Sequence, residues 1–159
     1  SSTGTSQYPL SKTNKINDKT LIKIEYFSPP IPIFEISKNV PEDVKNEVLQ
    51  SFNHFHSDLS SSGLKLRRSI EKLCAHLGFS EKNLHSSILS MKKDFSREAE
   101  LLLTLKLLGN EAVHSDDINE GDLLNAFEVQ EFVLGIFDRL ENEKLIEGKA
   151  EKLRLKFTK

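Results

Sequence analysis

Apolar residues recur at helical spacing over most of the chain. Between Val44 and Leu59 they follow one another at intervals of three or four residues, which places them on one face of an amphipathic helix. Pro41 and the two acidic residues after it suit the first turn of that helix, where the macrodipole favours negative charge. The small residues "SSSG" at 60–63 predict its end.

Four further helices are predicted after this break. Their apolar stripes run from Leu66 to Leu77, from Leu84 to Met91, from Leu101 to Leu108 and from Leu123 to Leu140. The expected boundaries are Gly78 after the second helix, Ser80 and Ser96 as caps of the third and fourth, Gly109 at the end of the fourth, and Asn119 with Asp122 as the cap of the fifth. We expect the fifth helix to run for more than about twenty residues.

Two short segments instead alternate with a period of two. In 20–27 ("TLIKIEYF") and in 153–157 ("LRLKF") apolar and charged residues alternate, which is typical of strands, and the two could pair. The proline-rich segment 28–41 is predicted to be extended, because proline fixes φ and removes a hydrogen-bond donor. The predicted fold class is therefore all-α, a bundle of about five helices with short extended or β segments at its N- and C-terminal ends.

Composition limits the organisation of the chain. Its 159 residues fit a single domain, which we expect to span 20–159, with a helical core over 42–145 and a charged tail over 146–159. Residues 1–19 are polar and are expected to be disordered or tag-like. The chain does not begin with Met, so we expect a trimmed or excised fragment.

The formal net charge of -2 argues against bulk attraction to polyanions. The single cysteine, Cys74, falls on an apolar stripe and cannot form an internal disulfide, so we expect a core residue in a reducing, cytoplasmic setting. No cofactor is predicted. No apolar run approaches the roughly 20 residues that cross a bilayer, so no membrane span is predicted either.

Three stretches, in order and spacing, together resemble the DUF4145 family, which is part of the broader HEPN-like helical superfamily. They are "IPIFEISKNVPEDVKNEVLQSFNHF", "LKLRRSIEKLCAHLGF" and "LKLLGNEAVHSDD". The last holds the most recognisable pattern, formed by Gly109, Asn110, Ala112 and His114. The resemblance implies a HEPN-like domain of a kind that often dimerises and that occurs alone or attached to restriction and anti-phage defence proteins.

Some HEPN-like domains are metal-independent ribonucleases, so the resemblance offers His114, Asn110 and Lys106 as candidate catalytic residues. His114 would deprotonate a ribose 2′-hydroxyl and Lys106 would neutralise the phosphate, with Asn110 holding the imidazole or the substrate. However, Lys106 stands where the nuclease motif has arginine, and lysine lacks the fork that grips a phosphate. The alternative, which we favour, is that His114 is structural and hydrogen-bonds to Asn110 or the backbone at the helix end.

Nearby charged residues form a second set of candidates, for contact with a ligand or partner. Arg68 is the residue that we expect to reach the Asn110–His114 region from the second helix. Glu111, Asp116 and Asp117 form an acidic cluster, which would complement the arginines of the second helix or the N-terminus of the fifth. The spacing of these acids and His114 fits no standard metal site, so no metal is predicted.

Basic residues gather in the second predicted helix, at Lys65, Arg67, Arg68 and Lys72. At helical spacing Arg68 and Lys72 share a face while Lys65 and Arg67 point elsewhere, and Glu71 can pair with Arg67. A solvated and partly paired face is therefore favoured over an RNA- or DNA-binding one.

The sequence favours a non-catalytic interaction or regulatory module. It would form a homodimer or dock a partner protein, with prokaryotic restriction or anti-phage defence as the setting that the resemblance implies. The first alternative is a metal-independent endoribonuclease that uses His114. The second is a nucleic-acid-binding accessory domain that uses Arg67, Arg68 and the basic tail.

Overall fold

The described part of the chain is helical. The computed structural model describes residues 32–114 and 117–158, and residues 31–159 form one compact unit. Its helices are α2 (Glu42–Phe55), α3 (Leu59–His76), α4 (Leu84–Met91), α5 (Ser96–His114) and α6 (Glu120–Phe157). No strand occurs within these two ranges. The prediction of an all-α fold is therefore confirmed.

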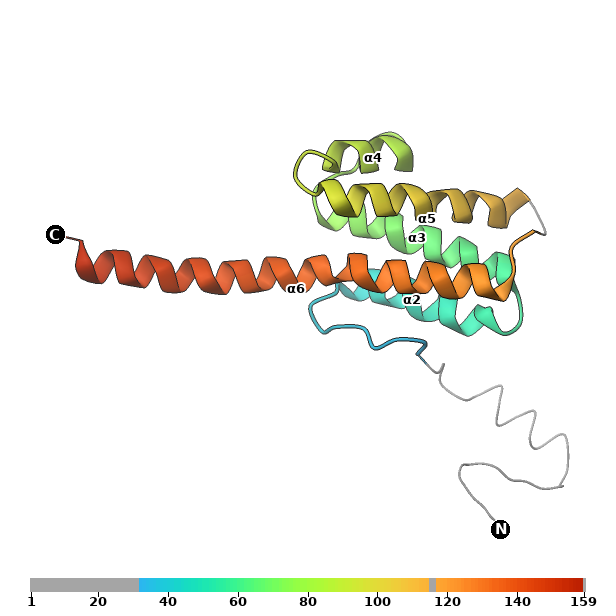
Figure 1. Ribbon diagram of the computed structural model, residues 1–159, viewed down its shortest axis with the longest axis horizontal. Helices are drawn as coiled ribbons and strands as arrows, with labels where there is room; N and C mark the ends of the chain where they lie inside the picture. Colours follow the sequence, from blue (N-terminus) through green and yellow to red (C-terminus); the bar gives the residue numbers. More distant parts are fainter. Residues whose placement is uncertain (1–31, 115–116, 159) are drawn as a thin grey trace, which may run out of the picture. The chain divides into compact units, whose positions relative to one another are not determined.

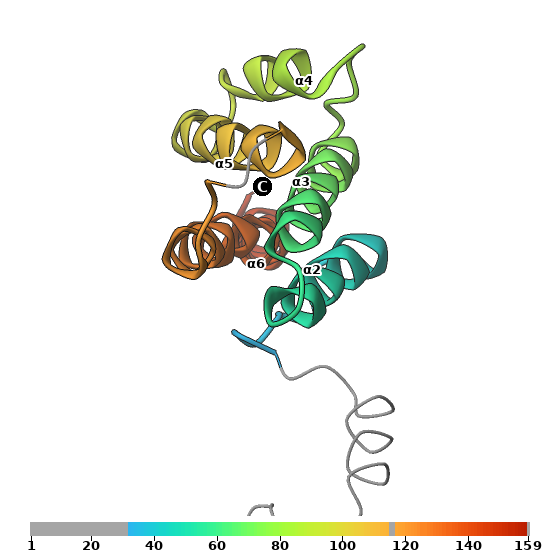
Figure 2. The same ribbon diagram turned by 90° about the vertical axis from the view of Figure 1, so that its right-hand side faces the viewer.

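Helix α3 lies at the centre of the bundle and contacts each of the other four helices. Figure 2 looks along the bundle and shows α5 and α6 next to each other beside α3, with α4 above and α2 below. An edge-to-face pair of Phe52 and Phe127, with ring centroids 5.2 Å apart, joins α2 to α6. Phe34 packs against the same Phe52 ring at 4.9 Å, so the described part of the entry segment packs against the core.

Two predicted helix boundaries are wrong. The segment "SSSG" lies inside α3, which begins at Leu59 because the Asp58 side chain accepts a hydrogen bond from the backbone N–H of Ser61. Asn83 rather than Ser80 caps α4, by accepting from the backbone N–H of Ser86. In both cases the side chain that caps the helix lies at the residue directly before it, which satisfies one of its free donors.

Two other boundaries match the prediction. Gly78 ends α3 in the left-handed region with φ 92°, and the amides of Gly78 and Phe79 donate to Ala75 and Cys74 as in a Schellman motif. Asn119 and Asp122 form a reciprocal capping box at the start of α6, which is 38 residues long.

The ends of α5 and α6 differ from the prediction. Helix α5 does not stop near Gly109 but continues to His114. Gly109 is not part of a turn; it lies where α5 packs closely against Arg67 of α3. Residues 153–157 are not a strand, because α6 continues through them to Phe157. The other predicted strand, Ile22–Tyr26, lies outside the described residues, so its pairing has no test.

Candidate functional site

Small residues let α3 and α5 approach closely at the stretch that carries the family pattern. A Cβ placed on Gly63 of α3 would lie 2.6 Å from the Cβ of Ala112. A Cβ placed on Gly109 of α5 would lie 2.9 Å from the Cβ of Arg67. Carbon atoms pack best at about 3.5–4.0 Å, so neither position has room for a larger side chain. Gly109 and Ala112 are therefore explained by the contact between the two helices.

Asn110 is held by α3. The guanidinium Nη1 of Arg67 donates a hydrogen bond to its Oδ1, and Arg67 also forms the predicted ion pair with Glu71, at 3.6 Å. The prediction that Arg68 would reach this region is wrong. Arg67 takes that place because its side chain runs across Gly109, where Cγ and Cδ would lie 3.4 Å and 3.6 Å from an added Cβ.

Arg68 instead belongs to a charge cluster around a buried carboxylate of α2. Glu47 has a largely buried side chain and faces three cations of α3: the Nζ of Lys72 at 2.6 Å, with Lys65 and Arg68 each at 3.6 Å. Lys65 thus shares a face with Arg68 and Lys72, contrary to the prediction. Burial opposes ionisation of Glu47, but the hydrogen bond from Lys72 and the three positive charges outweigh it, so the pKa of Glu47 is lowered.

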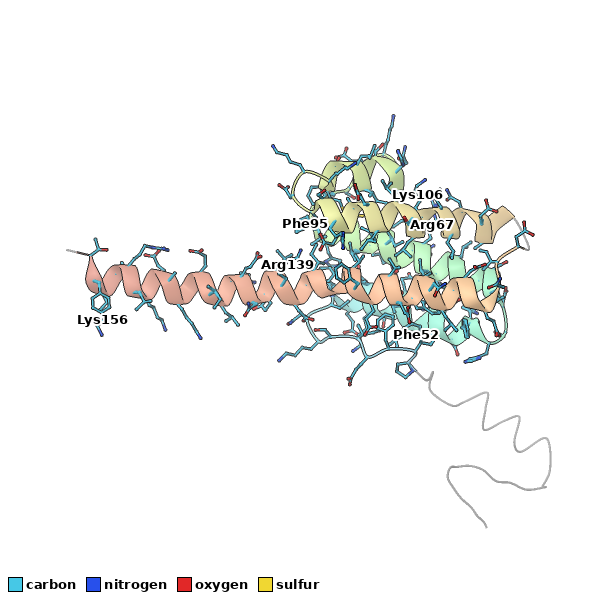
Figure 3. The ribbon with its side chains drawn as sticks, viewed as in Figure 1. Phe52, Arg67, Phe95, Lys106, Arg139 and Lys156 are labelled. Atoms are coloured by element: carbon cyan, nitrogen blue, oxygen red, sulfur yellow. The ribbon has the colours of Figure 1, made fainter. Side chains whose placement is uncertain are left out.

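The candidate catalytic residues all belong to α5. Figure 3 labels Lys106 on this helix, and its side chain is half-buried. Asn110 follows one helical turn later and is occupied by Arg67. His114 is the last residue of α5, and its side chain lies outside the described part of the chain, as does the whole of Asp116. Contact between His114 and Asn110 therefore stays a prediction.

Glu111 and Asp117 lie together beside a pocket of about 300 Å³ between the end of α5 and the start of α6. Leu108, Ile118, Asp122 and Asn125 complete its lining. The Asp122 carboxylate already accepts a hydrogen bond from the backbone N–H of Asn119. Within the described residues, no three His, Cys, Asp or Glu side chains are grouped so that they could hold a metal ion.

The second half of α6 leaves the bundle. Its last anchors are Asp138, which accepts from the side chains of Ser37 and Asn39, and Arg139, whose Nη2 lies 3.2 Å from Glu98 of α5. Beyond them the helix continues clear of the other helices, as Figure 1 shows and as the labelled Arg139 and Lys156 mark in Figure 3. We call residues 141–157 the projecting segment.

Apolar side chains lie in line along α6 at five positions, which we call the outer stripe: Phe132, Ile146, Ala150, Leu153 and Phe157. Ala150 is half-buried and the other four are exposed. Phe132 is 57% exposed, Ile146 55%, Leu153 59% and Phe157 69%. At 3.6 residues per turn these positions share one side of the helix, opposite the buried Phe127, Leu134 and other core residues.

A groove lies beside the near end of the outer stripe. It has a volume of about 290 Å³ and is lined by Arg97 and Leu101 of α5 and by Glu128, Val129 and Phe132 of α6. Phe132 belongs to both the outer stripe and this α5–α6 groove, whereas the charged Arg139 lies between Phe132 and Ile146 on the same side of α6.

The outer stripe and the buried Glu47 were not predicted from the sequence. The residues from Ile146 to Phe157 follow a helical spacing of four, three and four, but the alternation within 153–157 favoured a strand. Glu47 carried no signal, since a glutamate inside an amphipathic helix is ordinarily exposed.

Comparison with known proteins places the chain in a family. No curated protein and no solved structure matches it. In the part of the chain that the structure describes, no helix combines the length and the apolar character needed to cross a membrane. A family model does match, over residues 46–156, from within α2 to the end of the projecting segment. The chain therefore belongs to DUF4145, a family described as a domain of unknown function.

Proposed function

We propose that this chain is a non-catalytic interaction module that binds a partner through the projecting segment of α6. The observation that carries the proposal is the exposure of apolar side chains in that segment, where Ile146, Leu153 and Phe157 are more than half exposed in the part of the chain that the structure describes. Contiguous exposed apolar surface marks binding sites in soluble domains. An amphipathic helix that lays such a face against another protein is a recurring mode of recognition.

The lack of packing around the segment supports the same function. Most helical stability in proteins comes from packing, and residues 141–157 are only slightly longer than the about 12–15 residues below which an isolated helix is marginal in water. Arg154 pairs with Glu147 at 3.3 Å and with Glu151 at 2.7 Å within the segment, but exposed ion pairs of this kind are worth only about 0.3–0.5 kcal/mol. A partner helix would supply the packing that these contacts do not.

The site chemistry favours binding over catalysis. Gly109 and Ala112 serve the close contact of α3 with α5, and Asn110 is held by Arg67. Most of the family pattern is thus accounted for by packing. The cations of α3 are occupied by Glu47, Glu71 and Asn110, which disfavours nucleic-acid binding through Arg67 and Arg68. The endoribonuclease alternative rests on His114 and stays a prediction.

A pair of matched substitutions tests the proposal. Leu153→Glu places a charge on the outer stripe, whereas Leu155→Glu places the same charge half a turn away, at a position that is 75% exposed. Both chains are expected to keep the native circular dichroism spectrum and melting temperature, because both side chains are exposed in the projecting segment.

Association is then measured with each purified chain, by sedimentation for self-association and by affinity capture for other proteins. We expect Leu153→Glu to lose association with its partner and Leu155→Glu to keep it. If both substituted chains associate as the unsubstituted chain does, the projecting segment is not the binding element.

A further inference from the structure

Most of the outer stripe lies in the projecting segment, where Ile146, Leu153 and Phe157 are 55%, 59% and 69% exposed. Core residues of α6, such as Phe127 and Leu134, lie on the opposite side of the helix from Ile146 and Leu153. A second α6 can therefore lie along the projecting segment. Contact of this kind is self-complementary, because each copy offers the same surface to the other.

Charge is divided unevenly along α6. Between Glu120 and Asp138 the helix carries five acidic residues and no basic one. Between Gly148 and Phe157 it carries four basic residues and one acidic residue. Two such helices side by side in the same direction would place like charges together. In opposite directions, the basic end of each would lie along the acidic half of the other, which favours association and fixes its orientation.

The positions of these charges fit the outer stripe. Glu128 lies one turn before Phe132, and Lys156 lies one turn after Leu153 at the far end. Glu131 and Lys152 lie on the same flank of the helix as Lys156, with Lys152 farther from the stripe, and all four charged residues are exposed. When two helices pair in opposite directions, the residues on one flank of the stripe lie beside the residues on the same flank of the partner's stripe. The lysines of one copy would then come beside the glutamates of the other.

We propose that two copies of this chain pair in antiparallel fashion through the outer stripe, with the Phe157 end of each copy over the α5–α6 groove of the other. The inference rests on the proposed function and names its partner as a second copy. The groove is lined by Leu101, Val129 and Phe132, an apolar surface suited to an aromatic ring. Glu128, at its edge, meets the basic end of the incoming helix.

Charge reversal in the full chain tests both the partner and the orientation. One variant carries Lys152→Glu and Lys156→Glu, and the other carries Glu128→Lys and Glu131→Lys. Dissociation constants are measured by sedimentation equilibrium for the unsubstituted chain, for each variant alone and for the two variants mixed. Circular dichroism of each variant confirms that the fold is kept.

The antiparallel pair predicts that each variant alone self-associates at least about tenfold more weakly, because like charges then face each other, and that the mixture recovers the affinity of the unsubstituted chain. Variants that associate as tightly as the unsubstituted chain would overturn the antiparallel orientation. In a parallel pair each substituted residue would face the same residue of the other copy, so like charges would meet both before and after the substitution.

An unsubstituted chain that stays monomeric at all concentrations would overturn the pairing itself. In that case the proposed function survives only if Leu153→Glu, and not Leu155→Glu, abolishes capture of another protein. If neither self-association nor such a capture is found, both the pairing and the proposed function fail.

Discussion

Replacing Gly109 by alanine is expected to loosen the contact between α3 and α5. The added Cβ would lie 2.9 Å from the Cβ of Arg67. That neighbour is fixed close to the α3 backbone, so it cannot swing aside as the end of a long side chain can. The two helices must separate by several tenths of an ångström to restore ordinary van der Waals contact.

The expected change in the free energy of unfolding for Gly109→Ala is the sum of two opposing effects. Overpacking of a filled interior costs about 1–3 kcal/mol, whereas alanine gains about 1 kcal/mol over glycine inside a helix. The net result for Gly109→Ala is a destabilisation of about 1 kcal/mol. Gly135→Ala on α6 is the matched control, since a Cβ there meets nothing within 4 Å. It should stabilise the chain by up to about 1 kcal/mol.

Urea denaturation followed by circular dichroism measures both free energies of unfolding. We expect the midpoint to fall for Gly109→Ala and to rise for Gly135→Ala, with unchanged slopes. If Gly109→Ala stabilises the chain as much as Gly135→Ala does, the close contact is not the reason for glycine at this position. The structural account of the family pattern would then be wrong.

Three further predictions concern single side chains. Glu47→Gln should destabilise the chain by about 1–3 kcal/mol at neutral pH, since it leaves three cations around an uncharged group whose partners are partly exposed. Because the pKa of Glu47 in the folded chain lies below the ordinary 4.5, its contribution is present above that pH and disappears as pH falls through the lowered pKa. In urea titrations between pH 3 and 7, the free energy of unfolding should therefore fall less on acidification for Glu47→Gln than for the unsubstituted chain. The same pH dependence in both chains would contradict this role of Glu47. Burial, with a smaller effect from the charge of Glu71, raises the pKa of Cys74 to about 12, so a thiol reagent at mildly alkaline pH should leave the folded chain unmodified and react fully in urea. Rapid reaction of the folded chain would show that Cys74 is accessible. Finally, neither the unsubstituted chain nor His114→Ala should cleave labelled RNA in EDTA, and cleavage that is lost in His114→Ala would establish the endoribonuclease alternative.

The main helices could be predicted because their apolar spacing fixes a core face. Val44, Val48 and Phe52 are all buried as that spacing requires, and so are Leu66, Ile70 and Leu73. The cap of α6 could also be predicted, because Asn119 followed three residues later by Asp122 forms a local motif that depends on no distant contact.

The wrong predictions mainly concern residues whose role is set by contacts with residues far away in the sequence. Gly109 has the local properties of a helix end, but its role depends on Arg67, which lies 42 positions earlier in the chain. The tail matched a strand over five residues, yet the longer window from Ile146 to Phe157 fits a helix. Short apolar windows do not distinguish the two. Arg67 and Arg68 are adjacent in sequence, and only the crossing of α3 with its neighbours assigns one to Asn110 and the other to Glu47.

Amide hydrogen exchange in the projecting segment, measured on the full chain at low and at high protein concentration, tests whether this segment binds a second copy. Exchange reports local opening, so amides of residues 141–157 should be poorly protected in the dilute chain and become protected as copies associate. Amides of α3 should exchange at the same slow rate throughout. Protection of 141–157 that does not change with concentration would contradict the claim that this segment binds a second copy.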